Sequence, residues 1–500
     1  MKQFIKQHLY KIIGILLFVA ALVIYQPYVS DLPRGLHNWA QADRYSVAKM
    51  YETNGNFFEP RTHNLMTDDG RCGLEFPIIQ YLSGRLSHFT NIPLTAVYRL
   101  FSFLLLFGGF LFFASQFTLL AEFGVAMSLL FSPVLFFYGF NFNPDTSGLA
   151  LVLFSLAFVL KFEKTGTPKH VYFSILLAAL AALIKTSCGV YFIALTGAYG
   201  LYLIEQKKHF DLLKLTATFV ALTAVIALYD YFYFHKFNKD NWSIVFMSSS
   251  QPVKNKADLI GVWKAIKFWF GQYITWSQAA IICITFLFGF SMKQKKKTAI
   301  LGKLLWIFAL GLIGFLKMMG KQFIDHDYYY ISTFVPLAAI LISFVIYQTQ
   351  SFSINKNYVT LGIWILLISS FVVSAQSFKI RMSDTFVWKN KSIDSQTDWM
   401  QNGAEILDEI GIDLNKKIFA LYASAPNTAL VYFDRRGRTF NFEEMTRPPS
   451  NMDYWFDRIK PDFIICPRFV ADKFKTDQSK LYGNVVLFAK RPNFYIYKPI

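Results

Sequence analysis

Long apolar runs separated by short polar segments occupy most of the chain. Many of these runs hold about 17 to 25 mostly apolar residues, the length at which a helix crosses a hydrocarbon core of roughly 30 Å. The runs lie at residues 12–28, 95–115, 119–140, 145–161, 170–184, 188–204, 212–234, 273–291, 299–319, 328–348 and 357–376. The pattern predicts a polytopic α-helical membrane protein with about 11 transmembrane helices, whose membrane module covers residues 1–376.

The composition changes after residue 377, where polar residues return. Four short apolar runs, "KKIFALYA", "PDFIICPRF", "NVVLFAK" and "NFYIYK", are separated by Pro, Asn and Asp and are typical of strands. The segment "TDWMQNGAEILDEIGI" repeats apolar residues at helical spacing. Residues 377–500 are therefore predicted to form a small α/β domain. It contains neither GxGxxG nor GxxxxGK[ST], so nothing indicates nucleotide binding.

Lysines in the short connections indicate the orientation, because cytoplasmic loops of membrane proteins are enriched in Lys and Arg. They gather at four connections: Lys2, Lys6 and Lys11; Lys161, Lys164 and Lys169; Lys207 and Lys208; and Lys293, Lys295, Lys296 and Lys297. We therefore predict a multi-pass protein of the plasma (inner) membrane with a cytoplasmic N-terminus and an uncleaved first helix. Residues 29–94 (the first external loop), residues 235–272 and the C-terminal domain are predicted to lie on the external or periplasmic side.

The composition agrees with a membrane location, since 54% of the 500 residues are hydrophobic and only 16% are charged. Soluble domains carry roughly 25% charged residues. The formal charge of +18 comes from 50 Lys and Arg against 32 Asp and Glu. Part of this charge is the cytoplasmic lysine, so nucleic acid is not indicated as a partner.

The segment 235–272 is basic although it is predicted to be external, whereas lysines are usually enriched in cytoplasmic loops. Its lysines are Lys236, Lys239, Lys254, Lys256, Lys264 and Lys267. The stretch "DLIGVWKAIKFWFGQYI" predicts an amphipathic helix at the membrane interface, with membrane lipids as partners. Anionic lipid headgroups would account for the lysines, and a solvated face anchored by Trp263 and Trp269 would account for them equally well.

Four cysteines, Cys72, Cys188, Cys283 and Cys466, show no CxxC and no metal-ligand spacing. Cys188 and Cys283 lie in or beside apolar runs, where a cysteine usually packs as a small hydrophobic residue. Cys72 and Cys466 are both predicted to be external, and we expect them not to form a disulfide.

Ionisable residues collect at the external ends of the predicted helices. A charge in or beside hydrocarbon is costly and usually serves a substrate or a relay path. These residues are Asp43, Arg44, Arg71, Glu75, Asp145, Lys185, Lys321, Asp325, His326 and Asp327, and the aromatic residues beside them are Trp39, Tyr81, Tyr328, Tyr329 and Tyr330. They come from five segments on one side of the membrane, so we predict that they converge on one site.

Each of these residues, taken alone, has a simpler explanation. Asp145 follows Asn-Pro and could be the N-cap of the next helix. Lys185 could extend along apolar surface to reach water, and His326 could be a hydrogen-bonded interfacial histidine. Arg71 and Glu75 could form an exposed ion pair of little energetic value. The functional hypothesis therefore depends on all of these ionisable residues lying together, and not on any one of them.

The residue types at this rim suit glycosyl transfer. A carboxylate can take a proton from an acceptor hydroxyl as general base. Lys, Arg and protonated His can neutralise a leaving phosphate, and aromatic rings offer flat apolar faces to a sugar. Trp39 and Asp43 are four residues apart, on one face of a predicted juxtamembrane helix. These features indicate transfer of a sugar from a lipid-linked sugar phosphate to a hydroxyl, on the side of the membrane that lacks nucleotide-sugars.

Five motifs resemble the GT-C membrane glycosyltransferases, in particular the protein O-mannosyltransferase and aminoarabinose-transferase superfamily (glycosyltransferase family 39-like). They are "WAQAD", "EFPIIQYL", "NPD", "IKTS" and "HDYYYIS", and the similarity covers residues 1–376. The resemblance implies a GT-C-like fold with an external active site, and an external C-terminal domain as a usual companion. It also implies inverting transfer of a hexose or pentose from a polyprenyl-phosphate donor to an envelope glycan, lipid or protein.

The resemblance implies roles for individual residues as well. Asp43 would be the catalytic base. Glu75 and Asp145 would be supporting acids that position the acceptor or a divalent cation, for which Asp43 and Asp145 are the candidate ligands. The substrate-binding candidates are Trp39, Arg71, Lys185, Lys321, His326, Asp327 and Tyr328, of which Lys185, Arg71, Lys321 and His326 would contact the donor phosphate.

The first external loop departs from the family pattern at one position. Protein mannosyltransferases carry Asp-Glu there, whereas this chain has Asp43-Arg44. The difference favours a bacterial glycan or lipid acceptor over a protein. The alternative function is a membrane transporter or lipid flippase, but transporters usually show internal repeats and charges near the bilayer midplane. This sequence shows no repeat, and its charges gather at one rim.

Overall fold

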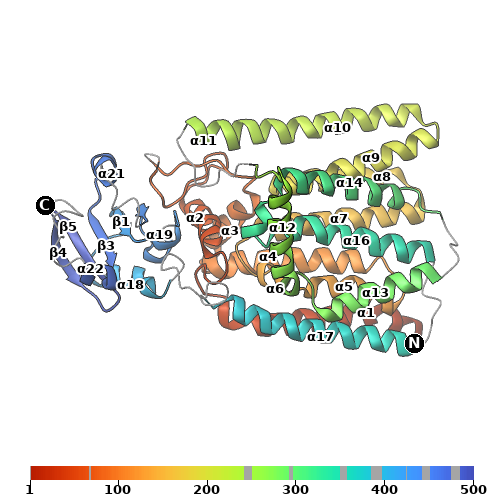
Figure 1. Ribbon diagram of the computed structural model, residues 1–500, viewed down its shortest axis with the longest axis horizontal. Helices are drawn as coiled ribbons and strands as arrows, with labels where there is room; N and C mark the ends of the chain where they lie inside the picture. Colours follow the sequence, from red (N-terminus) through yellow and green to blue (C-terminus); the bar gives the residue numbers. More distant parts are fainter. Residues whose placement is uncertain are drawn as a thin grey trace. The chain divides into compact units, whose positions relative to one another are not determined.

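The computed structural model describes residues 2–66, 69–240, 250–291, 297–349, 357–383, 397–423, 425–441, 451–473 and 485–500 (Figure 1). Contacts between its segments divide the chain into two compact units. The first unit comprises Met1–Val29, Arg99–Tyr231 and Ser248–Lys379, and the second comprises Ser30–Tyr98, Phe232–Met247 and Ile380–Ile500. Nearly all of the predicted first external loop thus belongs to the same unit as the predicted C-terminal domain.

The first unit is helical. Two of its helices also include residues of the second unit, namely the first residues of α4 and the last residues of α17. The helices are α1 (Lys2–Tyr25), α4 (Leu94–Ala114), α5 (Leu120–Ser128), α6 (Pro133–Tyr138), α7 (Pro144–Thr165), α8 (Pro168–Ile184), α9 (Gly189–Glu205), α10 (His209–Tyr229), α12 (Lys256–Tyr273), α13 (Trp276–Ser291), α14 (Leu301–Met319), α15 (Gln322–Asp325), α16 (Tyr329–Thr349) and α17 (Asn357–Arg381). A π-helical segment, Asp230–Lys236, follows α10.

Within the described residues, seven helices are long and apolar enough to cross a membrane. They are Leu94–Ala114, Pro144–Thr165, Thr186–Glu205, His209–Asp240, Leu301–Met319, Tyr329–Gln348 and Tyr358–Arg381. The pair α12 and α13 meets the same criterion together but bends by 94°, which gives up to eight spans. Three apolar helices are shorter: Ile12–Tyr28, Leu120–Phe131 and Pro168–Ile184. A multi-pass membrane protein is confirmed, whereas the predicted count of eleven spans is not.

The predicted span at residues 119–140 is broken. α5 ends at Ser128, a 3-10 turn over Leu129–Phe131 follows, and α6 begins at Pro133. Ser132 caps α6, because its hydroxyl oxygen accepts a hydrogen bond at 3.3 Å from the backbone N–H three residues further on. Proline has no N–H to donate into a preceding turn, so a helix begins at Pro133 and does not continue through it.

α7 is the most buried of the candidate spans, since 83% of its most apolar stretch is buried inside the structure. It packs against α8 and α16. Ser155 on α7 and Ser174 on α8 form a buried hydrogen bond, with their Oγ atoms 2.7 Å apart. Small polar side chains at such a contact let two helices approach closely and satisfy each other's hydrogen bonds.

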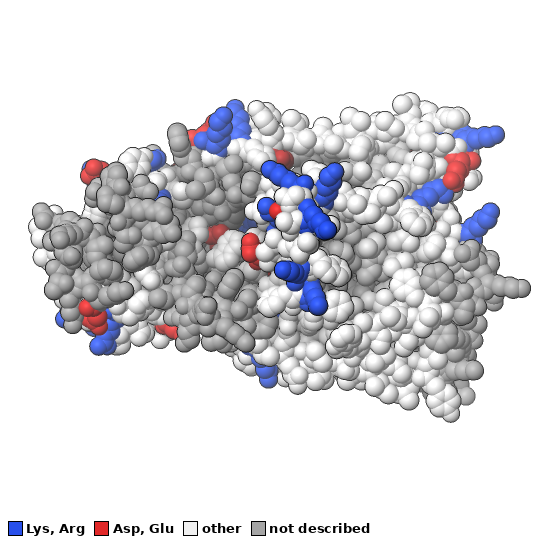
Figure 2. Space-filling model, viewed as in Figure 1, with Lys and Arg blue, Asp and Glu red and all other residues white. Residues whose placement is uncertain are grey.

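α12 has one buried face and one exposed face that is both basic and aromatic. Val262, Trp269 and Tyr273 are buried. Its exposed residues include the lysines Lys256, Lys264 and Lys267 and the large apolar residues Leu259, Ile260, Trp263, Phe268 and Phe270. Figure 2 shows lysine and arginine side chains gathered over α12. The predicted amphipathic segment thus forms a helix, and its place at a membrane surface stays a prediction.

The second unit combines helices with one mixed sheet. Its elements are α2 (Asn38–Thr53), α3 (Ile78–Thr90), α11 (Phe237–Asp240), α18 (Gly403–Glu409), β1 (Ile418–Leu421), α19 (Thr428–Phe433), β2 (Gly437–Phe440), α21 (Asn451–Ile459), β3 (Phe463–Pro467), α22 (Arg468–Lys473), β4 (Val485–Lys490) and β5 (Phe494–Pro499). The strand order is β2-β1-β3-β5-β4. β1 is parallel to β2 and β3, and β5 is antiparallel to β3 and β4. The four predicted apolar runs form β1, β3, β4 and β5, whereas β2 was not predicted.

Helices cover both faces of this sheet, because successive side chains of a strand point to opposite faces. Ile418 and Ala420 of β1 pack with residues of α18 and α19. Phe419 and Leu421 pack with residues of α21 and α22, and Leu65 of the first external loop joins this second cluster. The loop therefore contributes to the core of the sheet.

The same loop also pairs with the edge of the sheet at β2. The backbone N–H of Leu65 donates to the carbonyl of Gly437 at 2.6 Å, and the N–H of Gly437 donates to the carbonyl of His63 at 3.0 Å. Glycine is needed at 437, since a Cβ atom there would lie 1.7 Å from the carbonyl oxygen of Ile418. The pairing covers an otherwise open edge and joins the loop firmly to β2.

All four cysteines have free thiols. Cys72, Cys188 and Cys466 are buried, and Cys283 is exposed. Cys72 and Cys466 are thus unbridged in the structure.

Glu163, near the end of α7, closes the first turn of α14. Its carboxylate accepts hydrogen bonds from the backbone N–H groups of Ala299, Ile300 and Leu301 at 2.8, 2.7 and 2.8 Å. The first N–H groups of a helix lack partners within the helix, and an anion there also meets the positive end of the helix dipole. Glu163 therefore ties α14 to α7.

We predict that Glu163→Gln lowers the midpoint of thermal unfolding in detergent, followed by tryptophan fluorescence. The amide keeps only one acceptor oxygen and carries no charge, so the expected loss is about 1–2 kcal/mol. Glu205→Gln is the matched control, because the Glu205 side chain is 58% exposed and pairs with Lys303 at 2.8 Å. Exposed ion pairs contribute little. Equal midpoints for the two variants would contradict the capping role.

Candidate functional site

The predicted site residues are divided between the two units. The second unit contains Trp39, Asp43, Arg71 and Glu75, and the first contains Asp145, Lys185, Lys321, His326, Asp327 and Tyr328. Within each unit these residues make several separate polar contacts. The convergence of all these residues on one site stays a prediction.

Asp43 lies on the buried face of α2 and is only 3% exposed. Its Oδ1 atom accepts a hydrogen bond from Nδ2 of Asn427 at 2.8 Å. Burial raises the pKa of Asp43 to about 7, while the Asn427 hydrogen bond and the charge of Arg44 lower it. The carboxyl group is therefore poised to exchange a proton near neutral pH.

Trp39 lies one turn before Asp43 on α2 and remains 37% exposed. Its ring meets that of His37 edge to face, with centroids 6.3 Å apart. Trp39 thus offers an accessible aromatic surface on the helix that carries the predicted base.

Arg44, at which the sequence departs from the family pattern, holds the predicted acid Glu75. The Arg44 Nη2 atom lies 3.0 Å from Oε2 of Glu75, and the two side chains are 16% and 15% exposed. The Nε atom of Arg71 lies 2.7 Å from Oδ2 of Asp69. Glu75 and Arg71 are therefore both engaged in ion pairs that the sequence analysis did not predict.

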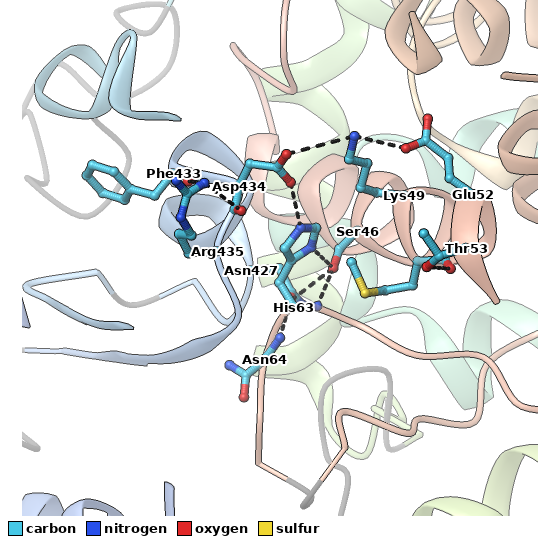
Figure 3. A network of polar contacts seen from close by, with 11 residues as sticks. Ser46, Lys49, Glu52, Thr53, His63, Asn64, Asn427, Phe433, Asp434 and Arg435 are labelled. Carbon is cyan, nitrogen blue, oxygen red and sulfur yellow. Dashed lines mark hydrogen bonds and ion pairs between the residues drawn. The ribbon is translucent and has the colours of Figure 1, made fainter. Parts of the chain in front are cut away.

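Asn427 belongs to a buried polar network, part of which Figure 3 shows. Its side-chain oxygen accepts hydrogen bonds from Oγ of Ser46 at 3.2 Å and from the backbone N–H of Asn64 at 3.1 Å. Oγ of Ser46 also lies 2.8 Å from Nδ1 of His63, and Nε2 of His63 lies 3.3 Å from Oδ1 of Asp434. Sequence analysis missed all these residues, because they are common polar residues far apart along the chain and no motif marks them.

Ser46, His63 and Asp434 have the residue types of a nucleophilic triad but not its geometry. In such triads the serine meets Nε2 and the carboxylate meets Nδ1, whereas the two nitrogens are exchanged here. Ser46 and His63 are 0% and 1% exposed. Ser46 also accepts a hydrogen bond from the backbone N–H of His63 at 2.8 Å. These residues therefore support the structure.

Asp434 differs from Asp43 in its neighbours. Oδ2 of Asp434 lies 3.8 Å from Nζ of Lys49. Burial raises the pKa of Asp434. The hydrogen bond with His63 and the charges of His63 and Lys49 outweigh this effect and bring the pKa below its usual value. The pKa values of two aspartates in the same unit are thus shifted in opposite directions. The pKa of Asp43 is raised, which favours its neutral form, and that of Asp434 is lowered, which favours its ionised form.

A polar cavity of about 390 Å³ lies beside this network. It is lined by Ser30, Asp31, Leu32, Arg34, Tyr45, Lys49, Thr95, Gln401, Asn402, Ala404, Glu405, Val431, Tyr432 and Asp434. Lys49 and Asp434 belong to both the network and the cavity wall. Charged, amide and hydroxyl side chains of this kind suit a polyhydroxylated ligand better than an apolar one.

In the first unit, Asp145 and Lys185 form a buried ion pair. Nζ of Lys185 lies 3.4 Å from Oδ2 of Asp145, and the two side chains are 10% and 1% exposed. Lys185 lies where α8 gives way to a 3-10 turn over Thr186–Cys188, and this break carries it to the first turn of α7. The interpretation of Asp145 as the N-cap of α7 is wrong, because the cap is Asn143, whose Oδ1 accepts from the N–H of Asp145 at 2.8 Å.

Two serines complete the cluster around Asp145. The hydroxyl of Ser332 donates to Oδ1 of Asp145 at 3.4 Å, and that of Ser187 donates to Oγ of Ser332 at 2.7 Å. Nζ of Lys185 lies 5.4 Å from the centre of the Tyr329 ring. Ser187 and Ser332 are the last residues of "IKTS" and "HDYYYIS". The motifs therefore contained both serines, although the sequence analysis gave them no role.

The segment before α16 places three more predicted residues. Asp327 is fully buried and accepts a hydrogen bond from the hydroxyl of Tyr138 at 2.8 Å. The ring of Tyr328 meets that of Tyr138 edge to face at 5.7 Å. Nδ1 of His326 lies 3.2 Å from the carbonyl oxygen of Gln322, which agrees with the simpler interpretation of His326 as a hydrogen-bonded histidine.

Lys321 contacts a different element. Its Nζ atom lies 3.5 Å from Oδ1 of Asp258 in the first turn of α12. The first unit thus brings Asp145 and Lys185 into contact, holds Asp327 and Tyr328 at Tyr138, and pairs Lys321 with α12.

Among the described residues, no three or more His, Cys, Asp or Glu side chains are grouped so that they could hold a metal ion. Asp43 is held by the amide of Asn427, and Asp145 by the ammonium group of Lys185. A divalent cation at Asp43 or Asp145 stays a prediction.

Comparison with known proteins identifies the fold. No protein-family model matches the sequence, and no curated protein matches it. The structure is similar to ArnT from Cupriavidus metallidurans bound to undecaprenyl phosphate, with a TM-score of 0.58 and 13% identity over 97% of this chain and 98% of that one. For ArnT in the apo state the TM-score is 0.60, with 12% identity over 97% of both chains. AftD, an arabinofuranosyltransferase from Mycobacteria, aligns with 97% of this chain but 40% of its own, at 13% identity and a TM-score of 0.46. ArnT is a GT-C glycosyltransferase, so this chain has a GT-C-like fold, as its motifs predicted.

Proposed function

We propose that the chain is a membrane glycosyltransferase that moves a sugar from a polyprenyl-phosphate donor to a hydroxyl of an envelope glycan, lipid or protein on the external side of the membrane. The observation that carries the proposal is a nearly buried aspartate with a pKa of about 7, Asp43, on a chain with a GT-C-like fold. One of the similar ArnT structures holds undecaprenyl phosphate, which supports a lipid of this class as donor.

Asp43 is the proposed general base. Its Oδ1 atom is held by Asn427, which leaves Oδ2 to take the proton of the acceptor hydroxyl. The acceptor oxygen attacks the anomeric carbon, the bond from that carbon to the phosphate oxygen breaks, and polyprenyl phosphate leaves with the bonding electrons. One displacement inverts the anomeric configuration. Phosphate needs little protonation to depart, so one base is sufficient.

Lys185 is the proposed contact for the donor phosphate, with Asp145 as the carboxylate that holds its ammonium group in place. An ammonium group in a water-poor setting stabilises the charge that develops on a leaving phosphate. Arg71, Lys321 and His326 stay weaker candidates for the same task. We assign the exposed ring of Trp39 to the sugar.

Among these acceptors, a glycan or a lipid is proposed in preference to a protein. Arg44 stands where protein mannosyltransferases carry a second acid, and it is paired with Glu75, so the acidic pair of that group is absent from this position. The polar cavity beside Lys49 and Asp434 is of a kind that suits a polyhydroxylated acceptor.

The exposed face of α12 is proposed to contact anionic lipids, including the donor. Trp263 and Phe270 share this face with Lys264 and Lys267. Aromatic side chains favour the boundary between headgroups and acyl chains, and lysines there attract lipid phosphates. α12 would thus raise the local concentration of the polyprenyl-phosphate sugar.

We predict that Asp43→Asn lowers kcat for release of polyprenyl phosphate by about 10²- to 10⁴-fold, the usual contribution of a general base. In the parent protein, Asp43 must be ionised to accept a proton. Since its pKa is raised to about 7, kcat/KM should fall about tenfold per pH unit below pH 7 and level off above it. Asp462→Asn, at a partly exposed carboxylate paired with Lys416, is the control. Full turnover by Asp43→Asn would show that the base is assigned wrongly.

We predict that Lys185→Met lowers both stability and turnover, because it leaves Asp145 as a buried charge without its cation. Breaking such a pair costs about 3–5 kcal/mol. The double variant Asp145→Asn/Lys185→Met removes both charges and should recover most of the unfolding midpoint while turnover stays at least tenfold low. Recovery of turnover together with stability would mean that Lys185 has only a structural role.

We predict that Lys264→Gln/Lys267→Gln raises KM for the donor by up to about 30-fold at low salt and leaves kcat unchanged, since each of the two lysines near an anionic surface is worth about 1 kcal/mol. High salt should remove the difference, because it screens exposed charges. Lys207→Gln/Lys208→Gln is the matched control, with the same charge change at a connection predicted to face the cytoplasm. Equal KM values for the two double variants, in vesicles with defined anionic lipid, would contradict the lipid contact.

A further inference from the structure

Asn427 connects the C-terminal part of the chain to Asp43. It is fully buried at the start of α19, and its amide nitrogen donates to Oδ1 of Asp43 at 2.8 Å. We propose that Asn427 is a positioning residue for the Asp43 carboxylate, so that the C-terminal part of the chain takes part in catalysis. This inference rests on the proposed function, in which Asp43 is the base.

The orientation of the Asn427 amide follows from its other contacts. The backbone N–H of Asn64 can only donate, and it points at the side-chain oxygen of Asn427 at 3.1 Å. The hydroxyl of Ser46 donates to the same oxygen at 3.2 Å. With the oxygen occupied by two donors, the NH₂ group is the one that faces Asp43. Asn427 thus supplies a donor to the carboxylate, which stabilises the ionised form.

The groups that hold Asn427 are themselves fixed. The side-chain amide of Asn64 donates to the carbonyl of Pro426 at 2.7 Å, directly before Asn427. The backbone N–H of His63 donates to Oγ of Ser46 at 2.8 Å. His63 and Asn64 in turn belong to the segment that pairs with β2 at Gly437. The amide of Asn427 is therefore held from the sheet and from α2 at once, and it has little freedom to turn away from Asp43.

The choice of a neutral amide has a chemical consequence. A lysine or arginine in the place of Asn427 would keep Asp43 permanently ionised and a weak base, as the cations around Asp434 do for that residue. An apolar side chain would leave the charge of Arg44 as the remaining influence that lowers the pKa of the buried Asp43, and would raise that pKa further, so that the carboxyl group is mostly protonated at neutral pH. An amide donor lies between these cases and suits a group that must both take up and release a proton.

The experiment is the pH dependence of kcat/KM for release of polyprenyl phosphate by the full-length protein, from a synthetic polyprenyl-phosphate sugar. In Asn427→Ala the ionised form of Asp43 loses a donor, so the midpoint of the profile should move upward by about one pH unit, with a loss of about tenfold near pH 6 and recovery to near the parent rate around pH 9. Asn493→Ala, at an exposed loop position, should keep the profile of the parent.

A purely structural role gives a different result, because misfolding lowers the rate by the same factor at every pH. An unchanged midpoint, or a uniform loss across the pH range, overturns the inference. If Asn427→Ala does not fold, Ser46→Ala is the second variant, because it removes one of the two donors that hold the Asn427 amide. Its midpoint should move in the same direction by a smaller amount. An unchanged midpoint in Ser46→Ala also overturns the inference. Asp43→Asn is measured in parallel. If that variant turns over fully, the proposed base fails, whereas an inactive Asp43→Asn with an unshifted Asn427→Ala removes only the role of Asn427.

Discussion

Burying a charge costs free energy unless an opposite charge or hydrogen bonds compensate it, and this constraint governs the polar groups of both units. In the first unit, Lys185 compensates Asp145, and three backbone N–H groups compensate Glu163. In the second unit, Asn427 compensates Asp43. Each of these contacts joins segments that are distant in the sequence, so the need to satisfy buried charges also fixes how the helices and loops are arranged.

The two shifted aspartates of the second unit show how the type of compensation separates structure from chemistry. Asp434 faces His63 and Lys49, and these partners favour its ionised form. Asp43 faces a neutral amide, and burial raises its pKa to about 7. Pairs of carboxyl groups whose environments separate their pKa values are typical of enzyme sites, where one holds charge and the other moves protons. In our account Asp43 moves the proton and Asp434 holds the network that supports it.

Much of the fold follows from local sequence, and much of the site does not. Apolar runs predict the long helices and four of the five strands, because period and length are local properties. The break at Ser132–Pro133 depends on capping and packing, so the apolar run at residues 119–140 does not form one continuous helix. Asp43, Asp145 and Lys185 were found through their motifs. Asn427 lies 384 residues after Asp43, and no pattern in a single sequence indicates that such a pair will meet.

The central claim is that the chain catalyses a single displacement at the anomeric carbon of a polyprenyl-phosphate sugar. The most direct measurement uses purified protein in detergent, a synthetic donor of known anomeric configuration and a cell-envelope acceptor, with NMR of the product and detection of the released lipid. The account predicts that polyprenyl phosphate is released and that the sugar is joined to the acceptor with inverted configuration. Retention of configuration would contradict the single-base mechanism, and a lack of both released polyprenyl phosphate and glycosylated acceptor would contradict the glycosyltransferase itself.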